Sequence, residues 1–348
     1  MPLLIVIFLL AGFIASCTAA PAVEILPALV YVQNSQLVLS RDLTADAAPL
    51  PFSLPDGCAI HSLHPAPQGA RLAILLDCAG GPLTEVIDLG SGKSGRPLAE
   101  PIDTRFLSWS ADGNSLYLLA DSFGDPRILR VDLQHGKAAR LPLTGSTYAL
   151  ACSPDSQTLV YAQTPGLGFG SELWAADRDG KDPRLLLAEP AHILALPRWS
   201  PDGRRLVYIR MPDTQVPFPN GELWLLDMTD GQKRFLSPAD AGHGYAPAWS
   251  PDGKFIAFVG GESLSAQDSA GNTRAGIYVL ETEAGVGFGV SRPENSQAGA
   301  PVWSPDGRFI VFPLQLDGKI NLWAYEMTTE KTIPLTQNGA CCPAWIGK

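Results

Sequence analysis

The chain has 348 residues and a formal net charge of −10, with 25 Lys and Arg against 35 Asp and Glu. This balance lacks the basic footprint that nucleic-acid binding requires, so we expect no nucleic-acid partner. Charged residues make up 17% of the chain, below the roughly 25% of average proteins, and 46% of the residues are hydrophobic, so a large core can form. The 34 Gly and 31 Pro residues favour a fold with many tight turns.

Residues 1–16 carry no charged side chain and are followed by Cys17. The run is shorter than the about 20 residues that a membrane-spanning helix needs. Its end, Ile14-Ala15-Ser16-Cys17, resembles the bacterial lipobox, which implies cleavage before Cys17 and lipid on the Cys17 sulfur. We therefore predict a lipoprotein signal peptide at 1–16, a lipidated cysteine with a tether at 17–23, and one domain at 24–348.

The predicted lipid would hold the protein to a membrane of the bacterial cell envelope, exported to the periplasmic or extracellular side. The residues before the lipobox include no Lys or Arg, although signal peptides normally begin with a positive charge. An ordinary signal peptide and an uncleaved apolar N-terminus are therefore the alternatives.

A five-residue segment recurs along the rest of the chain. Trp-Ser-Pro-Asp-Gly stands at 199–203, 249–253 and 303–307, with weaker copies at 65–69, 109–113 and 152–156. Pro fits the second position of a type I turn, Asp fits the third, and Gly takes the left-handed conformation that follows. A short apolar run follows each full copy, so each predicts a strand, a tight turn and a second strand. The Trp is expected to pack between adjacent sheets.

The first residues of these copies, together with Trp345, mark a repeat with a spacing of 42 to 54 residues. A period of this length with several short strands is typical of propeller blades. Seven apolar strands that end in an acidic residue run from 37–42 to 322–326 and divide the chain into seven units. We therefore predict an all-β, seven-bladed β-propeller of four-stranded antiparallel blades. A C-terminal inner strand that joins N-terminal outer strands would close the ring.

The segment 246–258, Ala-Pro-Ala-Trp-Ser-Pro-Asp-Gly-Lys-Phe-Ile-Ala-Phe, and the segment 276–281, Gly-Ile-Tyr-Val-Leu-Glu, resemble the WD-like repeat of TolB-type β-propellers. The resemblance covers roughly residues 24–346 and implies the fold more than the chemistry. Such propellers serve as envelope protein-binding scaffolds, as non-catalytic domains of prolyl oligopeptidase-type serine peptidases, and in some sugar-acid lyases. No Gly-x-Ser-x-Gly nucleophile motif occurs, so a serine peptidase is not predicted.

If the split unit is counted as blade 1, the long connections fall between the second and third strands of blades 4 to 6, at 164–170, 211–220 and 260–276. We expect them to form a raised lip beside the channel mouth, because functional loops commonly stand on rigid scaffolds. The alternative is that they are tolerated insertions without a role. Aromatic and Arg residues are the usual anchors of binding sites. The predicted binding residues are Phe169, His192, Arg210, Asp213, Phe218, His243 and Arg274.

These observations favour a non-catalytic cell-envelope scaffold that binds an unidentified envelope protein, peptide or glycan and uses no cofactor. The alternative is a metal-assisted lyase or hydrolase with its site at the channel mouth. His61, His192 and His243 each stand shortly before a repeat marker, and three neutral imidazoles can hold a transition metal. They lie on blades 2, 5 and 6, which are not all neighbours, so independent polar residues at loop ends are the simpler interpretation.

Cys58 and Cys78 flank the first predicted hairpin. A count outward from a pairing of Pro65 with Ala70 places Cys58 opposite residue 77, beside Cys78. A disulfide between the two cysteines is therefore predicted for an oxidising envelope.

Three other cysteines stand on predicted inner strands. Cys152 takes the position of a marker Trp and is expected to be a buried apolar residue. Cys341 and Cys342 are consecutive, so their side chains are expected to point to opposite faces of the strand. A disulfide between them would be strained.

Overall fold

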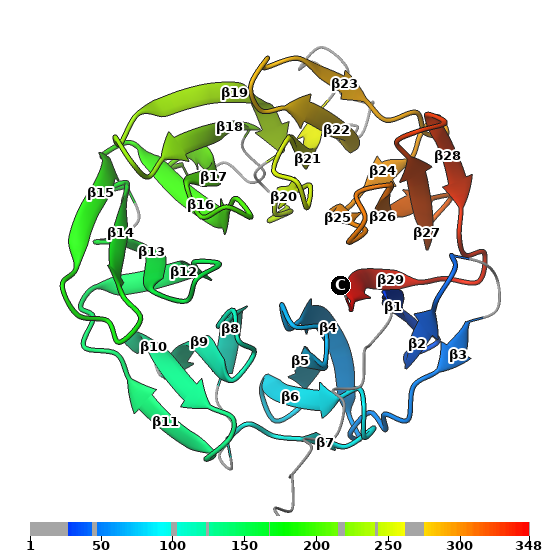
Figure 1. Cartoon of the computed structure of the whole chain (residues 1–348), viewed down its shortest axis with the longest axis horizontal. Helices are drawn as coiled ribbons and strands as arrows, with labels where there is room; N and C mark the ends of the chain where they lie inside the picture. The colour runs from blue at the N-terminus through cyan, green and yellow to red at the C-terminus, as the bar shows by residue number, and fades with distance from the viewer. Residues whose placement is uncertain are drawn as a thin grey trace, which may run out of the picture.

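The computed structural model describes residues 27–43, 47–98, 103–122, 125–166, 168–214, 220–240, 243–261 and 275–347. In these ranges the strands form seven antiparallel sheets, which stand as blades around a central axis (Figure 1). The predicted seven-bladed, all-β propeller is confirmed. Within the same ranges, no helix is long and apolar enough to cross a membrane.

Each blade runs from an inner strand at the axis to an outer strand at the rim. Blade 1 contains β29 (Cys341–Ile346), β1 (Ala28–Gln33), β2 (Gln36–Ser40) and β3 (Ala48–Pro49). Blade 2 contains β4 (Cys58–Pro65), β5 (Arg71–Cys78), β6 (Leu83–Asp88) and β7 (Ser94–Gly95). Blade 3 contains β8 (Asp103–Trp109), β9 (Ser115–Ser122), β10 (Asp125–Asp132) and β11 (Lys137–Arg140). Blade 4 contains β12 (Ser146–Cys152), β13 (Thr158–Thr164), β14 (Ser171–Asp177) and β15 (Arg184–Glu189).

The remaining blades follow the same order along the chain. Blade 5 contains β16 (His192–Trp199), β17 (Arg205–Pro212), β18 (Asn220–Asp227) and β19 (Lys233–Asp240). Blade 6 contains β20 (Ala248–Trp249), β21 (Phe255–Gly261), β22 (Ala275–Glu281) and β23 (Gly287–Gly289). Blade 7 contains β24 (Gln297–Ala298), β25 (Val302–Trp303), β26 (Phe309–Leu316), β27 (Lys319–Glu326) and β28 (Lys331–Pro334), because its inner strand is interrupted.

The two ends of the described chain meet in blade 1. Strand β29 pairs with β1, with Leu29 opposite Trp345 and Val30 opposite Ala344, and Figure 1 shows the two strands side by side near the axis. Ile346 is 1% exposed and packs into a core cluster that blades 1 and 2 share. The predicted closure of the ring by the C-terminal strand is confirmed.

The Trp-Ser-Pro-Asp-Gly turns share one hydrogen-bonded arrangement. In the copy at 249–253, the Gly253 N–H donates to the Ser250 carbonyl at 2.9 Å, and Gly253 has a φ of 70°, as the type I turn predicts. Ser250 Oγ donates to Asp252 Oδ1 at 2.6 Å and accepts from the Phe255 N–H at 2.9 Å. The same two contacts recur in four other copies, those that begin at 109, 152, 199 and 303.

We predict that Ser250→Ala lowers the free energy of unfolding by about 1–3 kcal/mol, since it leaves the Phe255 N–H without its partner. The hydroxyl group is enclosed, as Ser250 is only 2% exposed. Urea titration of the variant measures the change, with Ser94→Ala on the exposed strand β7 as the matched control. Equal stabilities of the two variants would contradict a structural role for the Ser–Asp contact.

The marker Trp side chains join neighbouring blades, as the sequence predicted. Trp249 Nε1 donates to the Arg198 carbonyl of the preceding blade at 3.1 Å. Equivalent bonds run from Trp109 to His64, from Trp199 to Ala151 and from Trp303 to Ala248. In four blades, the residue before the marker is thereby fixed against the next blade.

Two inner strands, β16 and β29, contain a bulge next to the Pro residue that stands two positions before the marker. The register of β16 with β17 shifts between Ala195 and Arg198, and Leu196 takes a positive φ of 54°. The register of β29 with β1 shifts in the same way, and Cys342 has a φ of 58°. Bulges suit Pro, which has no N–H for the ladder, and they redirect the side chains that follow.

Candidate functional site

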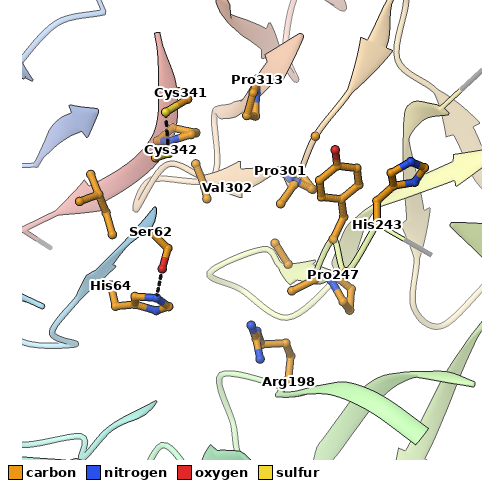
Figure 2. Close-up of a pocket in the computed structure, with 18 of the residues that line it drawn as sticks. Ser62, His64, Arg198, His243, Pro247, Pro301, Val302, Pro313, Cys341 and Cys342 are labelled. Carbon is orange, nitrogen blue, oxygen red and sulfur yellow. Dashed lines mark hydrogen bonds between the residues drawn. The ribbon is translucent and has the colours of Figure 1, made fainter. Parts of the chain in front are cut away.

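A cavity of about 830 Å³ lies on the propeller axis, and five of the seven blades contribute residues to it (Figure 2). Its walls are largely apolar and aromatic and include Tyr245, Pro247, Trp249 and Pro301. Ile320, at the start of β27 beside its turn with β26, is also among its lining residues. The cavity therefore reaches the face on which second and third strands are connected, where the sequence placed the lip.

One side chain with a fixed charge lines this cavity among the described residues, and it is Arg198. The bulge at Leu196 and Pro197 places Arg198 on the channel side of β16, and Figure 2 shows its guanidinium directed into the cavity. Arg198 Nη1 donates to the Pro197 carbonyl at 2.9 Å. Burial lowers the pKa of the guanidinium from its ordinary value, although the group still carries its charge at neutral pH.

His64 enters the same cavity from β4 and is hydrogen-bonded to Ser62 Oγ at 2.9 Å (Figure 2). Burial, followed by the charges of Arg198 and His61, lowers the pKa of the His64 imidazole to about 4. The ring is therefore neutral at physiological pH. It can donate or accept one hydrogen bond to a ligand without adding charge.

His64 and Arg198 were not among the predicted binding residues, although both precede a repeat marker by one residue. The signal was present in the repeat, because the residue before each marker was Ala, Val or Ser in other blades. Only His64 and Arg198 carry a charged or titratable side chain at this position before the marker, and both line the channel.

The expectation that Cys341 and Cys342 point to opposite faces is wrong. Their sulfur atoms lie 2.6 Å apart, and both residues line the cavity (Figure 2). The left-handed backbone of Cys342 at the bulge breaks the alternation of an extended strand and turns the two side chains to the same side.

Cys58 and Cys78 are joined by a disulfide across β4 and β5. The register expected from the sequence is wrong, because Cys58 lies directly opposite Cys78, and Pro65 pairs with Leu72. The turn is two residues longer than the count assumed, and a bulge between Ile60 and Ser62 shifts the register by one residue. Cys152 is partly buried, and burial raises the pKa of its thiol to about 12.

The first of the three lip connections, at 164–170, presents Phe169, whose side chain is 69% exposed. Asp213, from the next blade, accepts a hydrogen bond from the Gly170 N–H at 2.8 Å. Its other oxygen, Oδ1, is buried without a hydrogen-bond partner among the described residues. Asp213 therefore holds two neighbouring connections together and supports the exposed ring of Phe169.

Arg210 lies in an ion-pair network in blades 4 and 5. Arg210 Nη1 donates to Glu222 at 2.8 Å, its Nε donates to Glu189 at 3.4 Å, and its Nη2 lies 3.0 Å from His192 Nδ1. The guanidinium also stands over the Trp224 ring, at 5.6 Å from the centroid. The charges of Arg210 and Glu222 therefore balance each other, and this region supports the lip from below. Phe218 and Arg274 lie outside the described residues.

The structure does not bring His61, His192 and His243 together. His61 and His243 line the cavity, but His192 does not. His61 pairs with Asp77 at 3.0 Å and His243 with Asp240 at 2.9 Å. In the part of the chain that the structure describes, no group of three or more His, Cys, Asp or Glu side chains is placed to hold a metal ion.

No protein-family model matches the chain, and no curated protein matches it. Among solved structures, TolB from Acinetobacter baumannii has a TM-score of 0.57 and 17% identity, with 92% of this chain and 66% of TolB covered. Oligogalacturonate lyase from Vibrio parahaemolyticus has a TM-score of 0.65 and 13% identity, with coverages of 85% and 84%. A prolyl endopeptidase has a TM-score of 0.64 and 14% identity, with coverages of 94% and 50%.

At these identities the likeness shows the fold alone. The chain is a TolB-like β-propeller in its architecture. The same architecture occurs in a lyase and in peptidases, so the function has to be argued from the site.

Proposed function

We propose that the chain is a non-catalytic binding scaffold of the bacterial cell envelope, which holds a ligand at the channel mouth and on the adjoining lip of blades 4 to 6. The cavity of about 830 Å³ carries this proposal. Binding sites for ligands are typically concave, of this order of volume, and mostly apolar with a few convergent polar groups. The exposed Phe169 of the lip supplies an aromatic anchor of the kind that binding sites use.

The proposed cellular location is inferred from the first residues of the chain. The lipobox resemblance at Cys17 supports a signal peptide at 1–16, a lipid anchor with a tether at 17–23, and a propeller domain from 24 onward. The disulfide between Cys58 and Cys78 fits an exported protein, because disulfides persist in oxidising compartments. The propeller would then stand at a membrane surface, on the periplasmic or extracellular side.

A metal-assisted lyase or hydrolase is not favoured by the positions of the histidines. That mechanism requires His61, His192 and His243 to share one ion. His192 instead contacts Arg210, and the other two are paired with their own carboxylates. The structural likeness to oligogalacturonate lyase is one of fold and supplies no ligand set for this chain.

Crosslinking of intact cells followed by affinity capture tests the scaffold proposal. We expect Phe169→Ala to reduce the recovery of at least one wild-type partner severalfold, because it removes the most exposed large apolar side chain of the described lip. Phe235→Ala is the matched control, since Phe235 is 46% exposed but lies on the outer strand β19. If both variants capture the same partners as the wild type, in the same amounts, the lip is not the binding surface.

A further inference from the structure

We propose that the axial cavity binds a ligand through a carboxylate group, which the Arg198 guanidinium receives. This inference rests on the proposed binding function and adds the chemical class of the ligand. The chain contains 35 Asp and Glu residues, yet none of the described residues that line the cavity is acidic. The charge of the channel wall is thus opposite in sign to that of the chain as a whole.

Arg198 lines the cavity and has no carboxylate partner among the described residues. Arg205 pairs with Glu283, Arg308 with Glu326, and Arg210 with two glutamates. Arg198 donates one hydrogen bond to a neighbouring carbonyl, so most of its N–H groups remain for a ligand. An enclosed cation without a counter-charge costs free energy, and an entering anion that bonds to it recovers part of that cost.

The surroundings of Arg198 fit a carboxylate better than a phosphate. The described wall offers one fixed positive charge, which balances a single negative charge, and no Lys or second Arg for a dianion. The planar guanidinium fork matches the two oxygens of a carboxylate. His64 and Ser62 lie across the cavity from Arg198 in Figure 2. Their mutual hydrogen bond uses one of their two protons, so one of the two residues can donate a hydrogen bond to the anion without repelling it.

The rest of the cavity indicates the body of the ligand. Tyr245, Trp249, Pro247 and Pro301 form apolar walls around the polar group. Flat rings and prolines make favourable contacts with cyclic or apolar groups, and the volume of about 830 Å³ accommodates a ligand larger than a simple inorganic anion. We therefore expect a ring-bearing or apolar molecule that carries one carboxylate.

The test uses benzoate, phenylacetate and cinnamate, each beside its primary amide, together with inorganic phosphate. Binding is measured by ligand-observed NMR and by the fluorescence of the Trp residues in the wall. We expect each carboxylate that binds to do so at least about tenfold more tightly than its amide, which corresponds to one charge-assisted hydrogen bond. Arg198→Gln is expected to abolish this preference, and Arg198→Lys to retain part of it. Arg308→Gln, which alters an arginine outside the cavity that pairs with Glu326, should leave it unchanged.

The outcomes separate this inference from the proposed function. Amides that bind as tightly as carboxylates, or a preference that survives Arg198→Gln, would overturn the carboxylate assignment and leave the cavity as a ligand site. Phosphate that competes as well as the carboxylates would overturn the choice of anion. If no probe binds the wild-type protein, both the carboxylate site and the cavity as a ligand site are wrong. Should Arg198→Gln fail to fold, the comparison of acid with amide on the wild type decides.

Discussion

Ile346→Ala should destabilise the propeller by about 2–5 kcal/mol, the range for removal of a large aliphatic side chain from a packed core. Ile346 is 1% exposed, lies opposite Ala28 in the pairing of β29 with β1, and packs against residues of blades 1 and 2. The substitution therefore weakens the strand pairing that closes the ring, together with the contact between two blades. Urea or guanidinium titration measures the change in the free energy of unfolding.

Ile333→Ala is the control for this experiment. Ile333 is the same residue type in a strand of an adjacent blade, but it stands on the outer strand β28 and is 45% exposed. Surface substitutions of this kind usually change stability by less than about 0.5 kcal/mol. If the two variants lose the same stability, the C-terminal strand does not hold the ring closed.

The fold was predictable because the repeated segment dictates its own backbone. Pro, Asp and Gly fix the turn, and the preceding Ser adds a hydrogen bond that the structure repeats in five copies. The same chemistry at each repeat left a single arrangement for the strands between the turns. The position of Trp345 at the end of the series then required that the C-terminal strand complete the blade that the N-terminus begins.

The registers of the inner strands were not predictable by the same argument. A count along an extended strand assumes strict alternation, and the bulges near Leu196 and Cys342 interrupt it. The error at Cys341 and Cys342 has this cause, because a bulge changes which side chains face the channel. The register error at Cys58 and Cys78 came from the length of the turn between β4 and β5.

The sequence also did not reveal which charged side chains pair with one another in the folded chain. Arg210 was selected as a ligand contact because it lies near a long connection. In the folded chain its charge is balanced by Glu189 and Glu222, at sequence separations of 21 and 12 residues. Arg198 has no such partner among the described residues. Only the folded arrangement distinguishes an arginine that supports the scaffold from one that is open to a ligand.

His64 should make the stability of the protein depend on pH between about 6.5 and about 4. The imidazole has an ordinary pKa of 6.5 in the unfolded chain, and burial, Arg198 and His61 together lower its pKa to about 4 in the folded protein. The unfolded chain therefore takes up a proton at a higher pH than the folded protein does. Stability is lost as the pH falls below about 6.5, and the loss is complete near pH 4.

The expected loss is about 2–3 kcal/mol, which is the pKa shift converted to free energy and reduced for water in the channel. His64→Gln keeps a polar side chain but cannot be protonated, so it should lose less stability than the wild type over the same range, by about that amount. His135→Gln, which alters an exposed histidine on the turn after β10, is the control and should follow the wild type. Asp202 and its equivalents add a loss of their own, because a hydrogen bond from Ser200 lowers the pKa of Asp202, and the stability that it supplies is lost progressively below about pH 5. The wild type and both variants share this loss, so the difference between the wild type and His64→Gln measures the histidine. A wild-type protein and a His64→Gln variant with the same loss of stability between neutral pH and pH of about 4 would show that the histidine is not held neutral beside Arg198.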